Sequence, residues 1–113
     1  MKTACREAFD AEMESAIQSY RRGELAEAFR HLEVAHVLGQ RAVWPHVRTH
    51  VWMLRIGWKR RQPGEIRGQL LRIVLGALGS SLGIVPAGNT GGTDVGMFQR
   101  MPVAPALRRL IGE

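Results

Sequence analysis

Three of the four histidines of the chain lie within one short stretch, residues 36–54. His46 and His50 are four residues apart, so on a helix their rings lie one turn apart on the same face. Two histidines at this spacing can bind one ion, as they do in helical zinc sites. His36 follows Leu32 by one turn in the apolar stripe of the preceding predicted helix. The spacing therefore predicts a site at which two helices present three imidazoles.

A carboxylate on the first predicted helix completes the expected site. Glu12 lies at the edge of an apolar stripe, and a charge so close to a core is costly unless it is paired. Three imidazoles and one carboxylate suit zinc or a divalent iron, manganese, nickel or copper ion. A di-iron centre needs several inward carboxylates, so we expect a single ion. The predicted metal ligands are Glu12, His36, His46 and His50.

The same residues also have a purely structural explanation. An inward histidine is more often hydrogen-bonded to a backbone carbonyl or a carboxylate than bound to a metal, and paired histidines also occur by chance. Glu12 would then hold one imidazolium in a buried polar network. His31 lies about 140° from His36 around its helix, so these two histidines are not expected to share one site.

Apolar residues recur at three- and four-residue steps through most of the chain, which predicts helices almost throughout. The expected helices are 3–21, 24–38, 45–61 and 65–82. Residues 70–85 are the most apolar stretch, but they are shorter than the roughly 20 residues of a membrane-spanning helix. We therefore expect a buried core helix there, with contact to a membrane surface left open.

The last quarter of the chain is rich in glycine and proline. We expect a loop, an extended stretch over 95–101 and a final helical turn after Pro105. The predicted fold class is all-α, with two antiparallel helical hairpins in a tetratricopeptide-like or four-helix arrangement. We expect one domain over 1–113, made of a helical core (1–85) and a loop-rich tail (86–113) packed on it.

The full chain has a net charge of +6, and its positive charge is concentrated in the middle of the sequence. Arg48, Arg55 and Lys59 form a predicted basic stripe on the outer side of the third helix, next to Trp52. Such a stripe can bind an acidic protein or a nucleic acid, although no recognisable nucleic-acid module surrounds it. The alternative function is thus a non-enzymatic interaction module.

The remaining motifs exclude several kinds of chemistry. The segment GNTGG at 88–92 lacks the lysine followed by serine or threonine of a phosphate-binding loop, so we expect a tight turn. The chain has no defensible catalytic triad, and nothing in it requires an enzyme; catalysis would be metal-dependent hydrolysis or redox chemistry. A single cysteine, Cys5, and early charges that do not suit a signal peptide favour a cytoplasmic setting.

Three segments together resemble a small bacterial family, domain of unknown function 3703: AFRHLEVAHVLGQ at 28–40, PHVRTHVWML at 45–54, and GNTGG followed by MP at 101–102. The resemblance implies no activity or substrate. Its pattern includes His31, which could orient Glu12 or a ligand histidine. The positions of this chain that match the pattern are Glu12, His31, His36, Gly39, Gln40, His46 and His50. From the residues themselves, we expect a protein that binds a divalent transition metal, with metal handling as its role.

Overall fold

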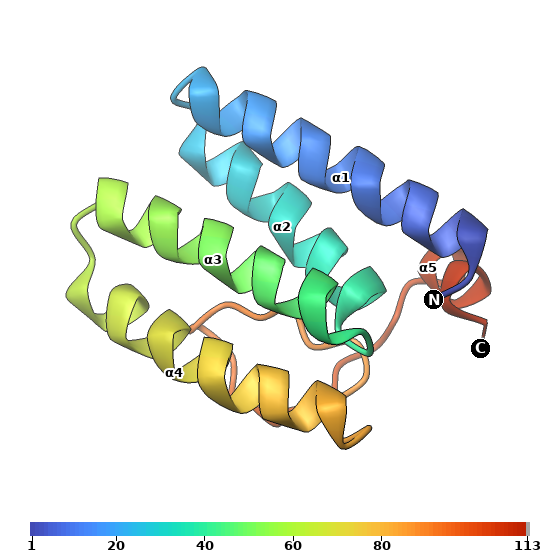
Figure 1. Ribbon diagram of the computed structural model, residues 1–113. Helices are drawn as coiled ribbons and strands as arrows, with labels where there is room; N and C mark the ends of the chain where they lie inside the picture. The colour runs from blue at the N-terminus through green and yellow to red at the C-terminus, as the bar shows by residue number, and fades with distance from the viewer. Residues whose placement is uncertain (113) are drawn as a thin grey trace.

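The computed structural model describes residues 1–112 of the 113-residue chain, and within that range it contains helices and no strand. This confirms the all-α prediction. Predicted boundaries are correct to within two residues for the four long helices. The helices are α1 (Thr3–Arg21), α2 (Leu25–Gly39), α3 (Val43–Lys59), α4 (Pro63–Ser81) and α5 (Pro105–Ile111) (Figure 1).

The four long helices pack in the order in which they occur along the chain. α1 packs against α2, α2 against α3, and α3 against α4 (Figure 1). The apolar stripe of each of the first three helices supplies the core, because residues three and four positions apart share one face of a helix. The largest buried apolar side chains are Phe9, Met13, Leu32, Met53 and Ile56.

The fourth helix lies at the edge of this row and corrects one expectation. Leu70, Leu71, Val74 and Leu78 are each more than half exposed, so the outward face of α4 is not part of a buried core. The fully buried residues of α4 are instead polar, Gln69 and Ser80. Within residues 1–112, no helix has both the length and the apolar character needed to cross a bilayer.

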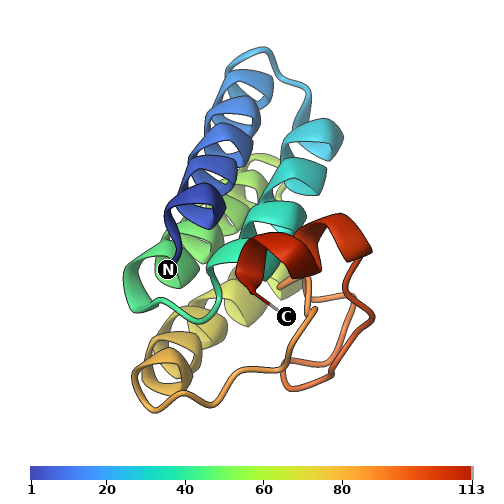
Figure 2. The same cartoon turned by 90° about the vertical axis from the view of Figure 1, so that its right-hand side faces the viewer.

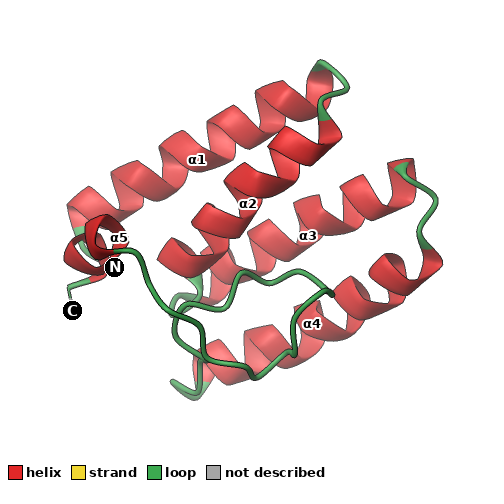
Figure 3. Cartoon of the chain, turned by 180° about the vertical axis from the view of Figure 1, so that it is seen from behind, coloured by secondary structure: helices red, strands yellow, loops and turns green. Residues whose placement is uncertain are grey.

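The segment between α4 and α5 returns across α4 and α2. Seen from behind, it runs over the side formed by α2, α3 and α4 (Figure 3), and the Arg72 guanidinium donates to the Val95 carbonyl across this junction. Turns occur at residues 93–94 and 97–98, so the stretch 95–101 is not continuously extended as expected, because the Asn89 amide donates to the carbonyls of Gly96 and Gln99 and folds the loop back. α5 begins at Pro105, as predicted, and packs against α1 and α2 beside the N-terminus (Figure 2).

Candidate metal centre

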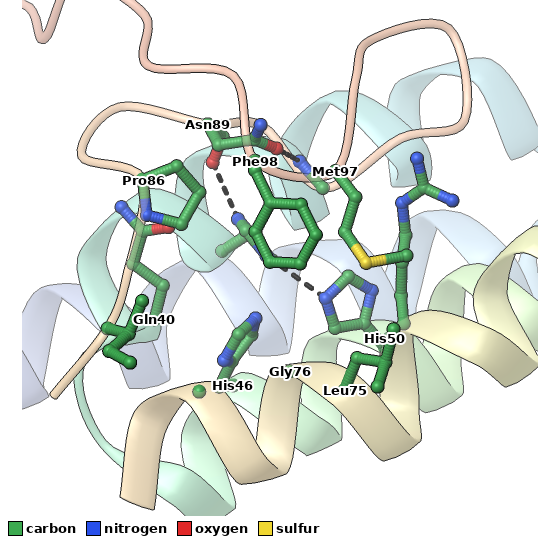
Figure 4. A pocket seen from close by; sticks show the side chains of 14 residues that line it. Gln40, His46, His50, Leu75, Gly76, Pro86, Asn89, Met97 and Phe98 are labelled. Carbon is green, nitrogen blue, oxygen red and sulfur yellow. Dashed lines mark hydrogen bonds between the residues drawn. The ribbon is translucent and has the colours of Figure 1, made fainter. Parts of the chain in front are cut away.

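Three histidines from two helices meet in the interior. His36 comes from α2, and His46 and His50 come from α3. One ring nitrogen from each lies within 4.8 Å of those of the other two. Their exposed fractions are only 3%, 6% and 2%. The structure therefore brings together the three imidazoles that the sequence spacing predicts (Figure 4).

A short connection between α2 and α3 places these rings together. α2 ends at Gly39 and α3 begins at Val43, so His36 lies in the last turn of one helix and His46 in the first turn of the next. The end of α2 lies close to the Phe9 ring of α1, and glycine allows this approach, because a Cβ on Gly39 would lie 2.8 Å from Cε2 of Phe9. The second α3 histidine follows one turn later on the same face.

Hydrogen bonds on the outer side of two of the rings fix their tautomers. Nδ1 of His36 lies 2.6 Å from the Asn89 carbonyl oxygen, which can only accept, so Nδ1 carries the hydrogen. Nδ1 of His46 lies 2.6 Å from the Ser80 hydroxyl. That hydroxyl donates its own hydrogen to the Gln40 carbonyl at 2.6 Å, so it accepts from His46. In His36 this leaves Nε2 with a bare lone pair, whereas the His46 ring also makes a hydrogen bond with the Gly76 backbone.

The third ring is held by an amide whose orientation is itself fixed. Nδ1 of His50 lies 2.6 Å from Oε1 of Gln69. The Nε2 amide group of Gln69 donates to the Glu65 carboxylate at 2.9 Å and to the Gly91 carbonyl at 3.0 Å, so its oxygen must face the ring. His50 therefore donates from Nδ1 and presents an unprotonated Nε2. Thr93 donates to the same carboxylate and completes this chain of hydrogen bonds.

The three inward nitrogens form an electron-rich cluster. Nε2 of His36 and Nε2 of His50 are 3.1 Å apart, with no hydrogen available to lie between them. Two imidazoles bound to one tetrahedral ion, with bonds of 2.0–2.1 Å, have nitrogens about 3.3 Å apart, so the spacing of this pair suits joint coordination. The nitrogens of the full set of three lie within 4.8 Å of one another, so the third ring would have to move closer to share the ion. Metal-bound histidines almost always donate their other N–H to a carbonyl, carboxylate or similar acceptor, as all three do here.

Burial keeps these rings neutral. Loss of solvation lowers the pKa of His46 and of His50 to about 4, and it lowers the pKa of His36 well below its ordinary value. Positive charge on a neighbouring ring would lower the pKa of His36 and of His46 further. Neutral imidazole is the form that binds metal ions, so no proton has to be displaced at neutral pH.

Glu12 is not part of this cluster, which corrects the predicted ligand set. Its carboxylate lies 2.7 Å from Nδ1 of His31, and both side chains are about a third exposed (30% and 32%). α1 packs against α2, on which His31 and His36 point in different directions. The carboxylate therefore contacts the histidine on the flank of α2 and does not belong to the group of three clustered rings.

The predicted basic stripe lies on another side of α3. The Arg55 guanidinium sits 4.3 Å above the Trp52 ring, and the Lys59 ammonium lies 5.2 Å from the centre of the Tyr20 ring. Arg55 and Lys59 are exposed, and Arg48 is half-buried. These cations thus rest on the aromatic pair that joins α1 to α3, away from the histidine cluster.

Sequence reasoning missed the residues that support the rings. Gln69, Ser80 and Asn89 are uncharged polar residues with no metal-binding spacing, and Asn89 belongs to the loop expected only to be a tight turn. Two glycines also pack directly on the rings. A Cβ on Gly76 would lie 2.9 Å from Cε1 of His46, and one on Gly91 would lie 2.6 Å from the His36 ring.

The family comparison agrees with the resemblance in the three sequence segments. The sequence model described as "Protein of unknown function (DUF3703)" matches residues 3–111. The chain belongs to this family. The DUF3703 match spans every helix of the described part of the chain and all three clustered histidines. No curated protein and no solved structure matches the chain. Function must therefore be argued from the site itself.

Proposed function

We propose that the protein binds one divalent transition-metal ion through the Nε2 atoms of His36, His46 and His50. One observation carries this proposal: Nδ1 of each ring meets an outer acceptor, and one ring nitrogen of each histidine lies within 4.8 Å of those of the other two, so three neutral imidazoles are gathered around one point. Lone pairs on neighbouring ring nitrogens repel each other, and a cation between them would replace this repulsion with coordinate bonds. A purely structural cluster would place a donor opposite at least one of these nitrogens.

The donor set indicates which ions to expect. Three imidazole nitrogens suit zinc, copper, nickel and divalent iron, whereas manganese prefers oxygen ligands. The only cysteine does not join the site, because the Cys5 thiol is buried elsewhere and donates to the Leu38 carbonyl. We expect zinc or copper to bind most tightly, following the general order of affinity for divalent ions. We propose metal handling as the cellular role.

The test is the metal content of protein purified without a histidine tag. Elemental analysis should find one equivalent of metal, and His50→Ala should reduce it to background. The matched control is His31→Ala, which removes a histidine that contacts Glu12 instead of the cluster and should retain one equivalent. Bound metal should also raise the melting temperature of the wild type, because only the folded state has the site.

The competing proposal is the interaction module. If the wild type contains no metal, and added zinc, copper, nickel and iron leave its melting temperature unchanged, the histidines are structural. The exposed cations Arg55 and Lys59 would then be the residues to examine for an acidic partner. A tetratricopeptide-like pairing of the helices would be the frame for that role.

A further inference from the structure

The cluster alone would leave a bound ion with uncompensated charge. All three expected ligands are neutral, and no carboxylate joins them. The nearest acidic group in the hydrogen-bond chain, Glu65, reaches His50 only through the amide of Gln69. Arg72, a further cation, lines the same pocket. A divalent ion here would therefore favour an anionic ligand from outside the chain, because buried charge is costly unless it is paired.

One residue of the pocket lining carries an acceptor without a donor, and this residue also borders a second cavity near the N-terminus. Gln40 is 3% exposed, and its side-chain oxygen Oε1 has no hydrogen-bond partner in the described residues. Gln40 lines the same pocket as the three histidines (Figure 4). Buried polar atoms in folded proteins are almost always satisfied, so an exception points to a bound group that brings a donor.

The pocket has room for only a small group. Its cavity is about 30 Å³, which is the space of one or two water molecules. Side chains from the tail, Met97 and Phe98, lie on one side of the rings, and Leu75 of α4 lies on the other (Figure 4). These apolar walls offer a ligand no hydrogen bonds, so its polar contacts would come from the ion, Gln40 and the polar lining residues Arg72 and Asn89.

Resting on the proposed metal site, we propose that the ion's remaining coordination position takes a small anion, in the resting protein a hydroxide that donates its hydrogen to Oε1 of Gln40. Such a hydroxide would come from a water molecule that bound the ion and lost one proton to the solvent. It supplies the missing negative charge and the missing donor together. The site is thus open and exchanges this ligand for other small anions.

The experiment uses the full-length protein loaded with one equivalent of Co²⁺, whose visible absorption reports changes among its ligands. Sodium azide should shift the spectrum and saturate at one anion per ion. Azide has no hydrogen to give to Gln40, so in the wild type it displaces a ligand that does. Gln40→Met, which removes the acceptor at similar size, should therefore bind azide about tenfold more tightly. Gln18→Met, the same change at an exposed position, should match the wild type.

X-ray absorption of the zinc-loaded wild type gives a test that needs no variant. It should find three imidazoles and one oxygen ligand. An azide-insensitive cobalt spectrum, or equal azide affinity in the wild type and in Gln40→Met, would overturn the inference while leaving the metal site standing. Weaker cobalt binding by Gln40→Met, with an azide-resistant wild type, would show that Gln40 binds the ion directly, which also overturns it. Absence of stoichiometric cobalt binding would overturn both proposals.

Discussion

The Nε2 atoms of His36 and His50 face each other at 3.1 Å, and each belongs to a ring whose hydrogen is already donated on the opposite side. Neither nitrogen can therefore donate to the other while both rings are neutral. This arrangement supports the proposal that the two nitrogens are metal ligands and that His46 supplies a third. The residues that hold each ring in place should therefore affect metal binding as the rings themselves do.

Replacing Gln69 should weaken metal binding although Gln69 touches no ion. Gln69→Leu removes the acceptor that orients His50 and keeps its Nε2 unprotonated. Loss of such an outer partner typically lowers metal affinity about 10- to 100-fold. Competition with a chromophoric chelator measures this change. Gln62→Leu, at an exposed position, is the matched control and should leave the affinity unchanged.

A methyl group on Gly76 should damage the site while favouring the helix. The added Cβ would lie 2.9 Å from the His46 ring, which must then move. Gly64→Ala, in the same helix with open space around it, is the control. We expect Gly76→Ala to bind metal at least about tenfold more weakly, since a displaced ring loses its coordination geometry. Gly64→Ala should keep wild-type affinity, and equal affinities in the two variants would contradict the assigned geometry.

The metal-free protein should lose stability in mild acid. The pKa values of His46 and His50 are lowered to about 4 in the folded state, against an ordinary value of 6.5. Between these values the unfolded chain binds more protons than the folded chain. The free energy of unfolding therefore decreases by about 1.4 kcal/mol for each unit by which the pH is lowered, for each of these two histidines. The loss should begin below pH 6.5, and the part that comes from His46 and His50 should level off below pH 4, while the lowered pKa of His36 adds to the loss. Urea unfolding in the presence of a chelator measures it, and a flat profile would show that the rings are not buried and neutral.

Glu12→Ala should leave metal content and affinity unchanged. The carboxylate pairs with His31 at a partly exposed position, where such pairs contribute about 0–1 kcal/mol. We therefore expect only a small change in the urea midpoint. Loss of metal from Glu12→Ala would restore Glu12 as a ligand and contradict its position in the structure.

The histidine cluster could be predicted because its geometry is mostly local. His46 and His50 share a face through helical spacing alone, and His36 continues an apolar stripe that has to face inward. Glu12 could not be assigned in the same way. Its position on a helical wheel shows that it borders the stripe, but not which neighbouring side chain it meets. The neighbour of Glu12 depends on how α1 is oriented about its own axis relative to α2, and in the structure this neighbour is His31.

The supporting residues depend on contacts distant in sequence, so periodicity could not find them. Gln69 and Ser80 belong to a helix that hydrophobicity alone predicts to be buried on its leucine-rich side. In the structure the polar residues of α4 face inward and accept hydrogen bonds from the rings, and Leu71 and Val74 face out. Asn89 contributes its main-chain oxygen, which no side-chain pattern can reveal.

The loop after α4 supplies no metal ligand, yet it is fastened to the site at two points, His36 to the Asn89 carbonyl and Gln69 to the Gly91 carbonyl. The first of these bonds joins residues 53 positions apart. We therefore expect metal binding to change how well the exposed region around Phe98 resists a protease.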